Sequence, residues 1–246
     1  MCGRYASSRD VEDLVDEFDI ADVRLAAPLP ASYNVAPTDE VYAVLERPAK
    51  PERPQERQLR SLRWGLVPSW AKDASIGSRM INARMETVAE KPAFRKAFAT
   101  RRCLLPADGY FEWYETSQTG PKGKPVKQPF FIRPRDGGVL AMAGLYEIWR
   151  DHSLPEDASD AWRWSCTVIT TSAEDDLGRI HDRMPLMVEP DRWDAWLDPT
   201  RPGALDLLVP AAPGLLEAYP VRPLVSNVRN NGPELIEPLP MEESLL

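Results

Sequence analysis

The sequence predicts an α+β fold, a single domain over residues 1–246 with a mainly antiparallel, barrel-like β-sheet flanked by short helices. Strand-like apolar runs follow one another with helices inserted between them, whereas a parallel sheet requires regular alternation of strand and helix. At roughly 150 residues per domain, a chain of 246 residues forms one large domain or two small ones, and no segment resembles a long linker. With 43% hydrophobic residues, 8 Trp, 7 Tyr and 6 Phe, the composition predicts a soluble globular protein and excludes a disordered chain.

The first predicted element is a short helix over residues 9–18, because apolar residues recur on one helical face at Val11, Leu14, Val15 and Phe18. Further short helices are expected over 92–99, 174–180 and 190–197. Runs of β-branched and aromatic residues predict strands over 41–46, 59–66, 110–115, 128–133, 139–149 and 164–171. Segments rich in proline and glycine predict exposed loops at 48–54 and 116–129.

The net charge of −8, from 30 basic and 38 acidic residues, argues at first against a nucleic-acid binder, because such domains carry a basic balance. The window from Arg57 to Arg102 nevertheless holds eleven basic and three acidic residues, a net charge of +8, which leaves −16 for the remainder. Two interpretations stay open. The basic residues lie on separate solvated faces, or they form a groove in which Trp64 and Trp70 interleave with phosphate-binding cations.

The three cysteines, Cys2, Cys103 and Cys166, cannot form a disulfide framework in a chain of this length, and their odd number favours a reducing, cytoplasmic compartment. No apolar run approaches the roughly 20 residues of a membrane span, and the first residues lack the apolar stretch of a secretory signal. Cys103 and Cys166 lie in apolar strand contexts and are predicted to be buried. No segment has the spacing of a zinc site, a P-loop or a dinucleotide-binding motif, so we expect no metal and no cofactor.

Cys2 combines two nucleophiles if the initiator methionine is removed, which normally happens when the second residue is small. The exposed α-amine, with a pKa of about 7.7–8.0, is substantially unprotonated near neutral pH, whereas lysine titrates near about 10.4. This amine can condense with an aldehyde to an imine, and the adjacent thiol, with a pKa of about 8.5, can close on the same carbon to a five-membered thiazolidine. The alternative is an incidental cysteine at a frayed terminus.

Two other segments carry groups suited to proton transfer and anion binding. His181, one of only two histidines, can exchange protons at physiological pH, and Arg183 beside it can hold a phosphate or a carboxylate. Asn82 and Arg84 share one face if their segment is extended, so that an amide can orient a nucleophile while a guanidinium binds a phosphate. A structural histidine beside a salt bridge is the alternative for His181.

Glu112 lies between Tyr110 and Tyr114 on one face of a predicted strand, with Phe111 and Trp113 on the other face. A carboxyl group between two aromatic rings is partly desolvated, and desolvation raises its pKa toward the range useful for general acid or base catalysis. The alternative is an ordinary strand glutamate that faces solvent.

Seven stretches occur in order between residues 2 and 236: CGRYA at 2–6, YNVAPT at 33–38, WGLVPSW at 64–70, INARMET at 81–87, LLPADGYFEW at 104–113, IHDRMPLMV at 180–188 and SNVRNNGPELI at 226–236. Taken together, they resemble the SOS-response-associated peptidase (SRAP) family of abasic-site processing proteins. The resemblance covers nearly the whole chain. Each stretch alone would be a weak signal, but the set in this order is specific.

The resemblance implies that the protein recognises abasic sites in single-stranded DNA and forms a covalent crosslink with the ring-opened sugar, a thiazolidine at its end point. It implies that Cys2 is the nucleophile and that Asn82, Glu112 and His181 are its companions in the active site. The implied DNA-contacting residues are Arg4, Asn34, Pro37, Trp70, Arg84, Trp113 and Arg183. On this hypothesis the protein is a cytoplasmic monomer that works at the bacterial nucleoid, without a membrane partner, and an untrapped imine adds lyase activity.

Two other functions stay open. A thiol peptidase, as the family name suggests, would use Cys2, His181 and Glu112 as a nucleophilic trio, with removal of the initiator segment as an autoproteolytic step. A non-enzymatic single-strand binding module would use the basic window alone. A thiol peptidase would remain active with a blocked α-amine, whereas a crosslinking protein would not. A single-strand binding module would form no covalent product with DNA.

Overall fold

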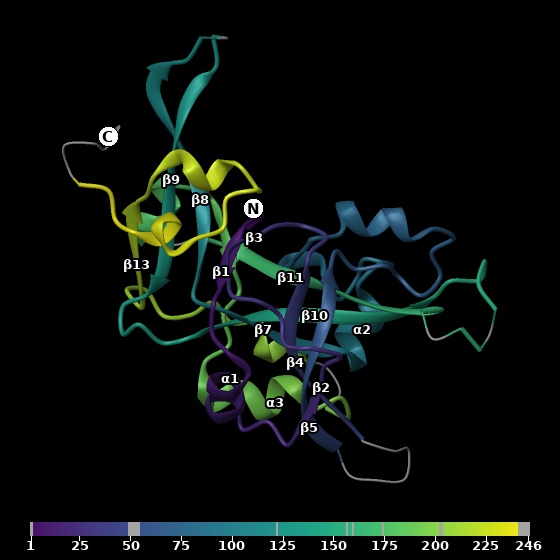
Figure 1. The fold of residues 1–246 in the computed structure, drawn as a ribbon. Helices are drawn as coiled ribbons and strands as arrows, with labels where there is room; N and C mark the ends of the chain where they lie inside the picture. Colours follow the sequence, from purple (N-terminus) through teal and green to yellow (C-terminus); the bar gives the residue numbers. More distant parts are fainter. Residues whose placement is uncertain are drawn as a thin grey trace.

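The computed structural model describes residues 2–48, 55–121, 123–155, 157–158, 160–173, 175–201 and 204–240. In the described part of the chain, two β-sheets form most of the protein, and short helices pack around them (Figure 1). The expected α+β class, with a mainly antiparallel, barrel-like sheet and short helices, is confirmed.

Five strands of the larger sheet close into a barrel: β4 (Glu40–Pro48), β5 (Gln55–Trp64), β7 (Arg102–Ala107), β10 (Leu140–Arg150) and β11 (Trp162–Ser172). Neighbours pair antiparallel in the order β11-β10-β7-β4-β5, and β5 then pairs parallel with β11, with Arg63 opposite Ser165. Three short strands extend this sheet: β2 (Asp22–Arg24) beside β5, and β6 (Asn82–Arg84) and β12 (Arg183–Pro185) beside β11. As a result, β11 holds both short strands that carry predicted site residues.

The smaller sheet has the order β13-β9-β8-β1-β3, with all pairings antiparallel. Its strands are β13 (Leu216–Pro220), β9 (Pro125–Pro134), β8 (Gly109–Thr119), β1 (Tyr5–Ser7) and β3 (Ser32–Val35). Tyr110 and Ile132 are cross-strand partners, and both pack in one apolar cluster with Cys2 and with Trp64 of the barrel. The core therefore joins the two sheets, and Figure 1 shows β1 between the long β8–β9 hairpin and the barrel.

The helices are α1 (Val11–Phe18), α2 (Arg95–Thr100) and α3 (Trp193–Leu197), with 3₁₀-helices η1 (Ala74–Arg79), η2 (Met85–Thr87), η3 (Asp175–Arg179), η4 (Pro190–Arg192), η5 (Ala204–Leu207), η6 (Pro223–Ser226) and η7 (Pro233–Ile236). α1 begins where the Asp10 carboxylate accepts a hydrogen bond from the Asp13 amide. It ends at Phe18, whose ring stacks on Trp193 with centroids 4.5 Å apart. None of the described helices is long and apolar enough to cross a membrane.

Most predicted elements are confirmed, and one prediction is wrong. The helices expected over 9–18, 92–99 and 190–197 form, all six expected strands form, and the segment 174–180 contains a 3₁₀-helix rather than an α-helix. The loop expected over 116–129 is mostly strand, since β8 continues to Thr119 and β9 starts at Pro125. Pairing with the neighbouring strand satisfies this backbone and overrides the loop-forming composition. Residues 49–54 of the other predicted loop lie outside the described residues.

Two residues of the basic window, Trp64 and Arg102, lie in the core, so Trp64 is not available to stack on a base. The Trp64 side chain is fully buried, and its indole N–H donates to the Ile81 carbonyl at 2.9 Å. Arg102 is also buried and donates to the carbonyls of Phe98 at 2.9 Å and Trp196 at 2.7 Å, which joins α2 to α3. Part of the excess positive charge therefore stabilises the fold and cannot contact a ligand.

All three cysteines are buried and carry free thiols. The predicted burial of Cys103 and Cys166 is confirmed, and both are fully inaccessible in the cluster between the barrel and the smaller sheet.

Candidate active site

Cys2 directly precedes β1, which pairs with β8 in the smaller sheet. Tyr5 pairs with Tyr110 of β8, and the Phe111 amide donates to the Arg4 carbonyl at 2.9 Å. Continuing this antiparallel register by one residue along each strand brings the Cys2–Gly3 segment beside Glu112. Cys2 is fully buried there. The nucleophile predicted from the sequence therefore lies inside the molecule, next to the predicted acid or base.

Asn82 fixes the backbone at Cys2 from the barrel side. β6 places Asn82 opposite Val168 of β11, and its Nδ2 donates to the Cys2 carbonyl at 2.7 Å. The Oδ1 of Asn82 is buried and has no hydrogen-bond partner among the residues that the structure describes. An unpaired buried acceptor is unfavourable, so this oxygen is suited to accept a hydrogen bond from a group that the resting protein does not supply.

Glu112 is 4% exposed, and burial raises the pKa of its carboxyl group to about 7, against the opposing effect of the positive charge at the chain's amino terminus. A carboxyl group with this pKa can both give and take a proton near neutral pH. The predicted alternation of β8 is confirmed, since Tyr110 packs in the cluster that contains Cys2 while Phe111 and Trp113 pack in a different cluster.

The thiol of Cys2 is not activated in this environment. Burial raises its pKa well above the usual value, and the nearby charge of Glu112 raises it further. The thiol is therefore protonated at neutral pH, and a reaction that begins with the thiolate is disfavoured.

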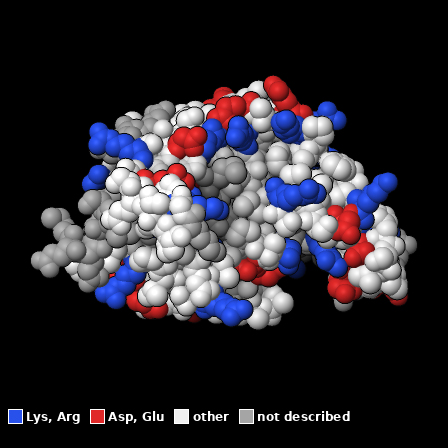
Figure 2. Space-filling view, turned by 90° about the horizontal axis from the view of Figure 1, so that it is seen from above, with Lys and Arg blue, Asp and Glu red and all other residues white. Residues whose placement is uncertain are grey.

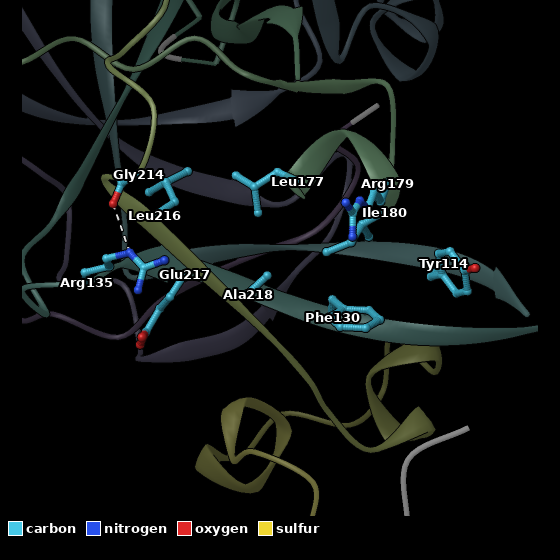
Figure 3. Close-up of a pocket in the computed structure, with 10 residues that line it drawn as sticks. All are labelled: Tyr114, Phe130, Arg135, Leu177, Arg179, Ile180, Gly214, Leu216, Glu217 and Ala218. Carbon is cyan, nitrogen blue, oxygen red and sulfur yellow. Dashed lines mark hydrogen bonds between the residues drawn. The ribbon is translucent and has the colours of Figure 1, made fainter. Parts of the chain in front are cut away.

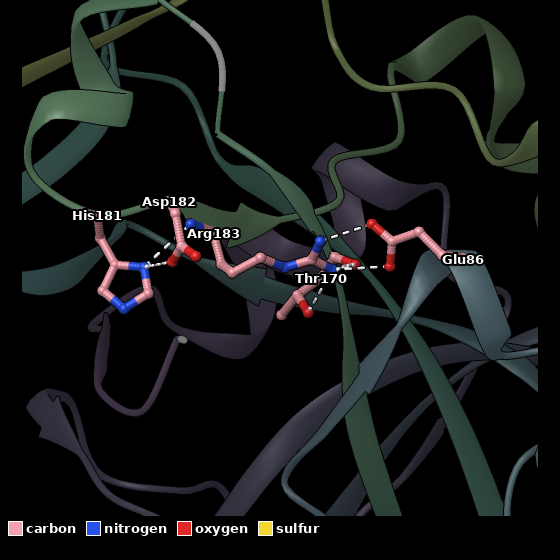
Figure 4. Close-up of polar contacts among 5 residues, drawn as sticks. All are labelled: Glu86, Thr170, His181, Asp182 and Arg183. Atoms are coloured by element: carbon pink, nitrogen blue, oxygen red, sulfur yellow. Dashed lines mark hydrogen bonds and ion pairs between the residues drawn. The ribbon is translucent and has the colours of Figure 1, made fainter.

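His181 lies in the loop that follows η3, and its imidazole is held by its own neighbours in the chain (Figure 4). The Arg183 amide donates to Nδ1 at 2.9 Å, and Oδ1 of Asp182 lies 3.0 Å from the same nitrogen. Burial lowers the pKa of His181, and the positive charge at the amino terminus lowers it further. The lowered pKa favours the neutral ring at pH 7, and a neutral ring whose Nδ1 accepts from the Arg183 amide has its proton on Nε2.

Arg183 projects from β12 toward Glu86 of η2, whose carboxylate already neutralises it (Figure 4). Its two terminal nitrogens contact the two oxygens of Glu86 at 2.5 and 3.1 Å, and Nη2 donates to the Thr170 carbonyl at 2.6 Å. The hydrogen bonds from Arg183 hold the pKa of Glu86 below its usual range. Glu86 thus occupies the place at Arg183 where a phosphate is expected.

Arg4 and Asn34 form a buried clamp on the C-terminal segment. Nη1 of Arg4 donates to Asn34 Oδ1 at 2.8 Å and to the Val225 carbonyl at 3.0 Å. Nδ2 of Asn34 is close to three carbonyls, with the Asn227 oxygen at 3.1 Å and the Asn230 oxygen at 2.8 Å. Since Asn34 is 3% exposed, its side chain organises Arg4 and the loop around residues 225–230.

A hollow of about 590 Å³ opens beside these groups and is lined by Glu112, Trp113, Lys127, His181 and Ser226. The indole N–H of Trp113 donates to the Ser226 hydroxyl at 3.1 Å, and the Arg4 guanidinium lies 5.9 Å from the centre of the Trp113 ring. The structure thus brings two predicted catalytic residues and two predicted DNA-contacting residues to one place.

The other predicted contacts lie outside this hollow. Trp70 is 59% exposed, with its indole nitrogen 3.4 Å from the Pro92 carbonyl. Arg84 is exposed on β6 opposite Thr170, and Pro37 is half-buried in the turn before β4. Figure 2 shows a face where Lys and Arg side chains surround a central hollow, with acidic side chains between them.

Sequence reasoning missed Glu86, Thr170 and Ser226, which hold Arg183 and Trp113. Glu86 gave one signal, because it is one of three acidic residues in the basic window. Ser226 is the first residue of the stretch at 226–236, and Thr170 gave no signal, since a threonine in a strand is common. Within the described ranges, no group of three or more His, Cys, Asp or Glu residues is arranged to hold a metal ion.

Known proteins resemble this chain over nearly its whole length. Residues 1–228 match the model of the family "SOS response associated peptidase (SRAP)". The chain is 38% identical over 241 residues to the abasic site processing protein YoaM of Bacillus subtilis (strain 168), which covers 96% of this chain and 98% of YoaM. It is 33% identical over 247 residues to the abasic site processing protein YedK of Escherichia coli (strain K12), which covers 97% of this chain and all of YedK.

The fold also matches a solved structure. An X-ray crystal structure of a protein from Bacteroides thetaiotaomicron superposes with a TM-score of 0.78 at 22% sequence identity, and the match covers 97% of this chain and 100% of that chain. At this level of identity the likeness concerns the fold alone.

Proposed function

The chain belongs to the SOS response associated peptidase (SRAP) family, and on this premise we propose that it captures abasic sites in single-stranded DNA as a covalent thiazolidine crosslink on Cys2, which shields the lesion. The observation that carries the proposal is the position of Cys2, which is hydrogen-bonded to Asn82 through its carbonyl and lies beside a glutamate with a pKa of about 7. The relatives' names describe processing of abasic sites, and aldehyde capture is the chemistry that these residues support.

The α-amine of Cys2, freed by removal of residue 1, attacks first. It has a pKa of about 7.7–8.0 when unperturbed, whereas burial keeps the Cys2 thiol protonated. The amine adds to the aldehyde carbon of the ring-opened sugar to give a carbinolamine. Glu112 then gives a proton to the departing hydroxyl group, which leaves as water, and the resulting carboxylate takes the proton of the iminium nitrogen, so that a neutral imine remains.

The thiol closes the ring. Its sulfur bonds to the imine carbon while its proton passes to the imine nitrogen, so the thiazolidine forms without any further reactant. The hydrogen bond from Asn82 to the Cys2 carbonyl limits rotation of the residue, and this restriction favours the geometry of closure. An imine that escapes closure can undergo β-elimination of the 3′ phosphate, which is the proposed lyase activity.

His181 assists the opening of the sugar. As a neutral imidazole whose Nδ1 accepts from the Arg183 amide, it presents an N–H donor at Nε2 to the ring oxygen. The same group can return a proton in the reverse direction, which makes His181 a candidate for crosslink reversal.

The proposed DNA-contacting set divides into two groups. Arg4, Arg84 and Arg183 are proposed to bind phosphates, while Trp113, Trp70 and Pro37 are proposed to pack against bases. Asn34 contributes indirectly by positioning Arg4, because the hydrogen bonds of its side-chain amide are made inside the protein.

A gel experiment tests this proposal. Purified protein is incubated with an oligonucleotide that contains one abasic site and with the intact oligonucleotide, and both are run under denaturing conditions. We expect a stable adduct only with abasic DNA, and none when an uncleaved N-terminal extension blocks the amine. The same extension at the C-terminus is the control. Cys2→Ser should give only an adduct that borohydride traps, and a stable adduct from the blocked protein would contradict the mechanism.

A thiol peptidase or autopeptidase that uses Cys2 is the second candidate, since the family description contains that activity. The raised pKa of the Cys2 thiol argues against it. A blocked amine separates the two, because a thiol peptidase retains its activity and a crosslinking protein does not.

A further inference from the structure

A second and larger hollow, of about 830 Å³, lies on the inner face of the smaller sheet (Figure 3). One wall consists of side chains from three adjacent strands, with Tyr114 on β8, Phe130 on β9 and Ala218 on β13. The opposite wall comes from η3 and the residues after it, including Leu177 and Ile180. Nothing in the proposed chemistry at Cys2 uses this hollow.

The hollow continues the candidate active site. Glu112 and Tyr114 are two residues apart on β8 and therefore face the same side of the sheet. Phe130 lies directly opposite Glu112 in the strand ladder. On the other wall, His181 directly follows Ile180. A DNA strand with its lesion at Glu112 and His181 has this hollow beside it, at about the distance of two strand residues, roughly 6.8 Å.

The lining of the hollow combines apolar surface with positive charge. Figure 3 shows Arg179 above Phe130 and Ala218, and Arg135 at the far end beside Glu217. The carboxylate of Glu217 is paired with Arg133 at 2.8 Å. Aromatic rings next to guanidinium groups suit a base attached to a phosphate.

We propose that this hollow is a subsite for the nucleotide that adjoins the abasic site, with its base against the half-buried ring of Tyr114 and its phosphate at Arg179. The inference rests on the proposed function. Unstacking a base from a single strand costs little, and stacking on a protein ring compensates for it without regard to sequence. Such a subsite makes recognition depend on a neighbouring nucleotide on one side of the lesion and not on the identity of its base.

Truncated oligonucleotides test the subsite. Three strands carry the abasic site in the middle, at the 5′ end or at the 3′ end, and crosslinking rates are measured with protein below saturation. For the unmodified protein we expect the rate to fall about tenfold when the nucleotide on one side is removed. Removal on the other side should have a smaller effect.

Two variants then connect this loss to the hollow. Arg179→Gln changes an exposed side chain, and Ala218→Trp fills the space between the walls. Both should slow crosslinking of the central-site strand about tenfold and leave the strand that lacks the relevant nucleotide unchanged. Arg24→Gln on β2, also an exposed arginine, is the control and should match the unmodified protein on all three strands. An equal loss on all three strands, or no loss with Arg179→Gln, overturns the inference.

Binding of strands with a tetrahydrofuran abasic analogue, which has no aldehyde, separates this inference from the proposed function. If the analogue strands show the same dependence on one flanking nucleotide and on Arg179, the subsite exists even where no crosslink forms. If the protein crosslinks abasic DNA but neither readout depends on Arg179, the subsite is absent and the proposed function stands.

Discussion

The apolar cluster between the sheets holds three cysteines that are equally buried but have different polar neighbours. Cys103 and Cys166 lie in the barrel, and burial is the largest cause that raises the pKa of each thiol. Cys2 directly precedes β1 of the smaller sheet, where its carbonyl accepts a hydrogen bond from Asn82 and the charge of Glu112 acts on its thiol. Burial by itself therefore does not create a reactive site. The difference comes from two polar neighbours and from the chain terminus, which supplies an amine.

The largest expected effect is the difference in crosslinking between a variant of Cys2 and a variant of Cys103. Cys2→Ala should abolish the stable crosslink, because the thiol is required to close the thiazolidine. Cys103→Ala should leave crosslinking unchanged and lower the free energy of unfolding by about 1–2 kcal/mol, since it removes a buried sulfur from a packed interior. Gel assays and urea denaturation measure the two quantities. A stable adduct from Cys2→Ala would show that Cys2 is not the residue that forms the crosslink.

The second expected effect concerns Glu112. Glu112→Gln keeps the size of the side chain and removes its proton transfer, so the crosslinking rate should fall about 100-fold. The unmodified protein should react more slowly as the pH rises above about 8, where the amine is already unprotonated and Glu112, with a pKa of about 7, has lost its proton. The variant should lack this titration. Rates from pH 5 to 9 measure it, and an unaltered pH profile in the variant would exclude Glu112 as the acid.

Stability provides an independent measure of the same carboxyl group. Burial raises the pKa of Glu112 to about 7, so the native state binds more protons than the unfolded chain between about pH 4.3 and 7. The stability of the unmodified protein relative to Glu112→Gln therefore falls as the pH rises through this window. The difference reaches the order of 3 kcal/mol above pH 7 and disappears below about pH 4. A constant difference across the window would contradict the raised pKa.

Asn82→Ala should have a smaller effect. It removes the hydrogen bond to the Cys2 carbonyl, and we expect crosslinking to slow about tenfold while the chain stays folded. Asn231→Ala is a matched control, because Asn231 also bonds to backbone groups but lies on the exposed surface. Single-turnover rates compare the two variants. Equal rates for Asn82→Ala and the unmodified protein would mean that Cys2 needs no positioning from the barrel.

Glu86→Gln should have the smallest effect, and it acts on binding. Glu86 neutralises Arg183 through two contacts, so its loss leaves a cation available to DNA. We expect intact single-stranded DNA to bind a few-fold more tightly and the salt dependence of the affinity to steepen by about one phosphate contact. Fluorescence anisotropy at several salt concentrations measures both. An unchanged salt dependence would mean that Arg183 does not contact phosphates.

Much of the fold and part of the site could be predicted from local sequence signals. The spans of α1 and of the central strands follow from apolar periodicity, and the expected faces of β8 place Tyr110 and Glu112 together. The chemistry expected of Cys2 follows from its position at residue 2, which is evident from the sequence without the fold. Composition did not predict the structure correctly where contacts with distant segments determine it. The segment 116–129 looks like a loop and forms two strands, and Trp64 lies in a basic window but packs in the core.

The sequence by itself determined which groups are available: an N-terminal cysteine, a glutamate between two tyrosines, one histidine beside an arginine, and an ordered set of family motifs. Only the tertiary structure decided what each group contacts. It neutralised Arg183 with Glu86, buried Asn34 as a clamp on Arg4, and raised the pKa of Glu112 by burial. The physical reason is that charge pairing and desolvation depend on distances between residues far apart in the chain. Those distances are set by closure of the barrel and by the register of β1 on β8.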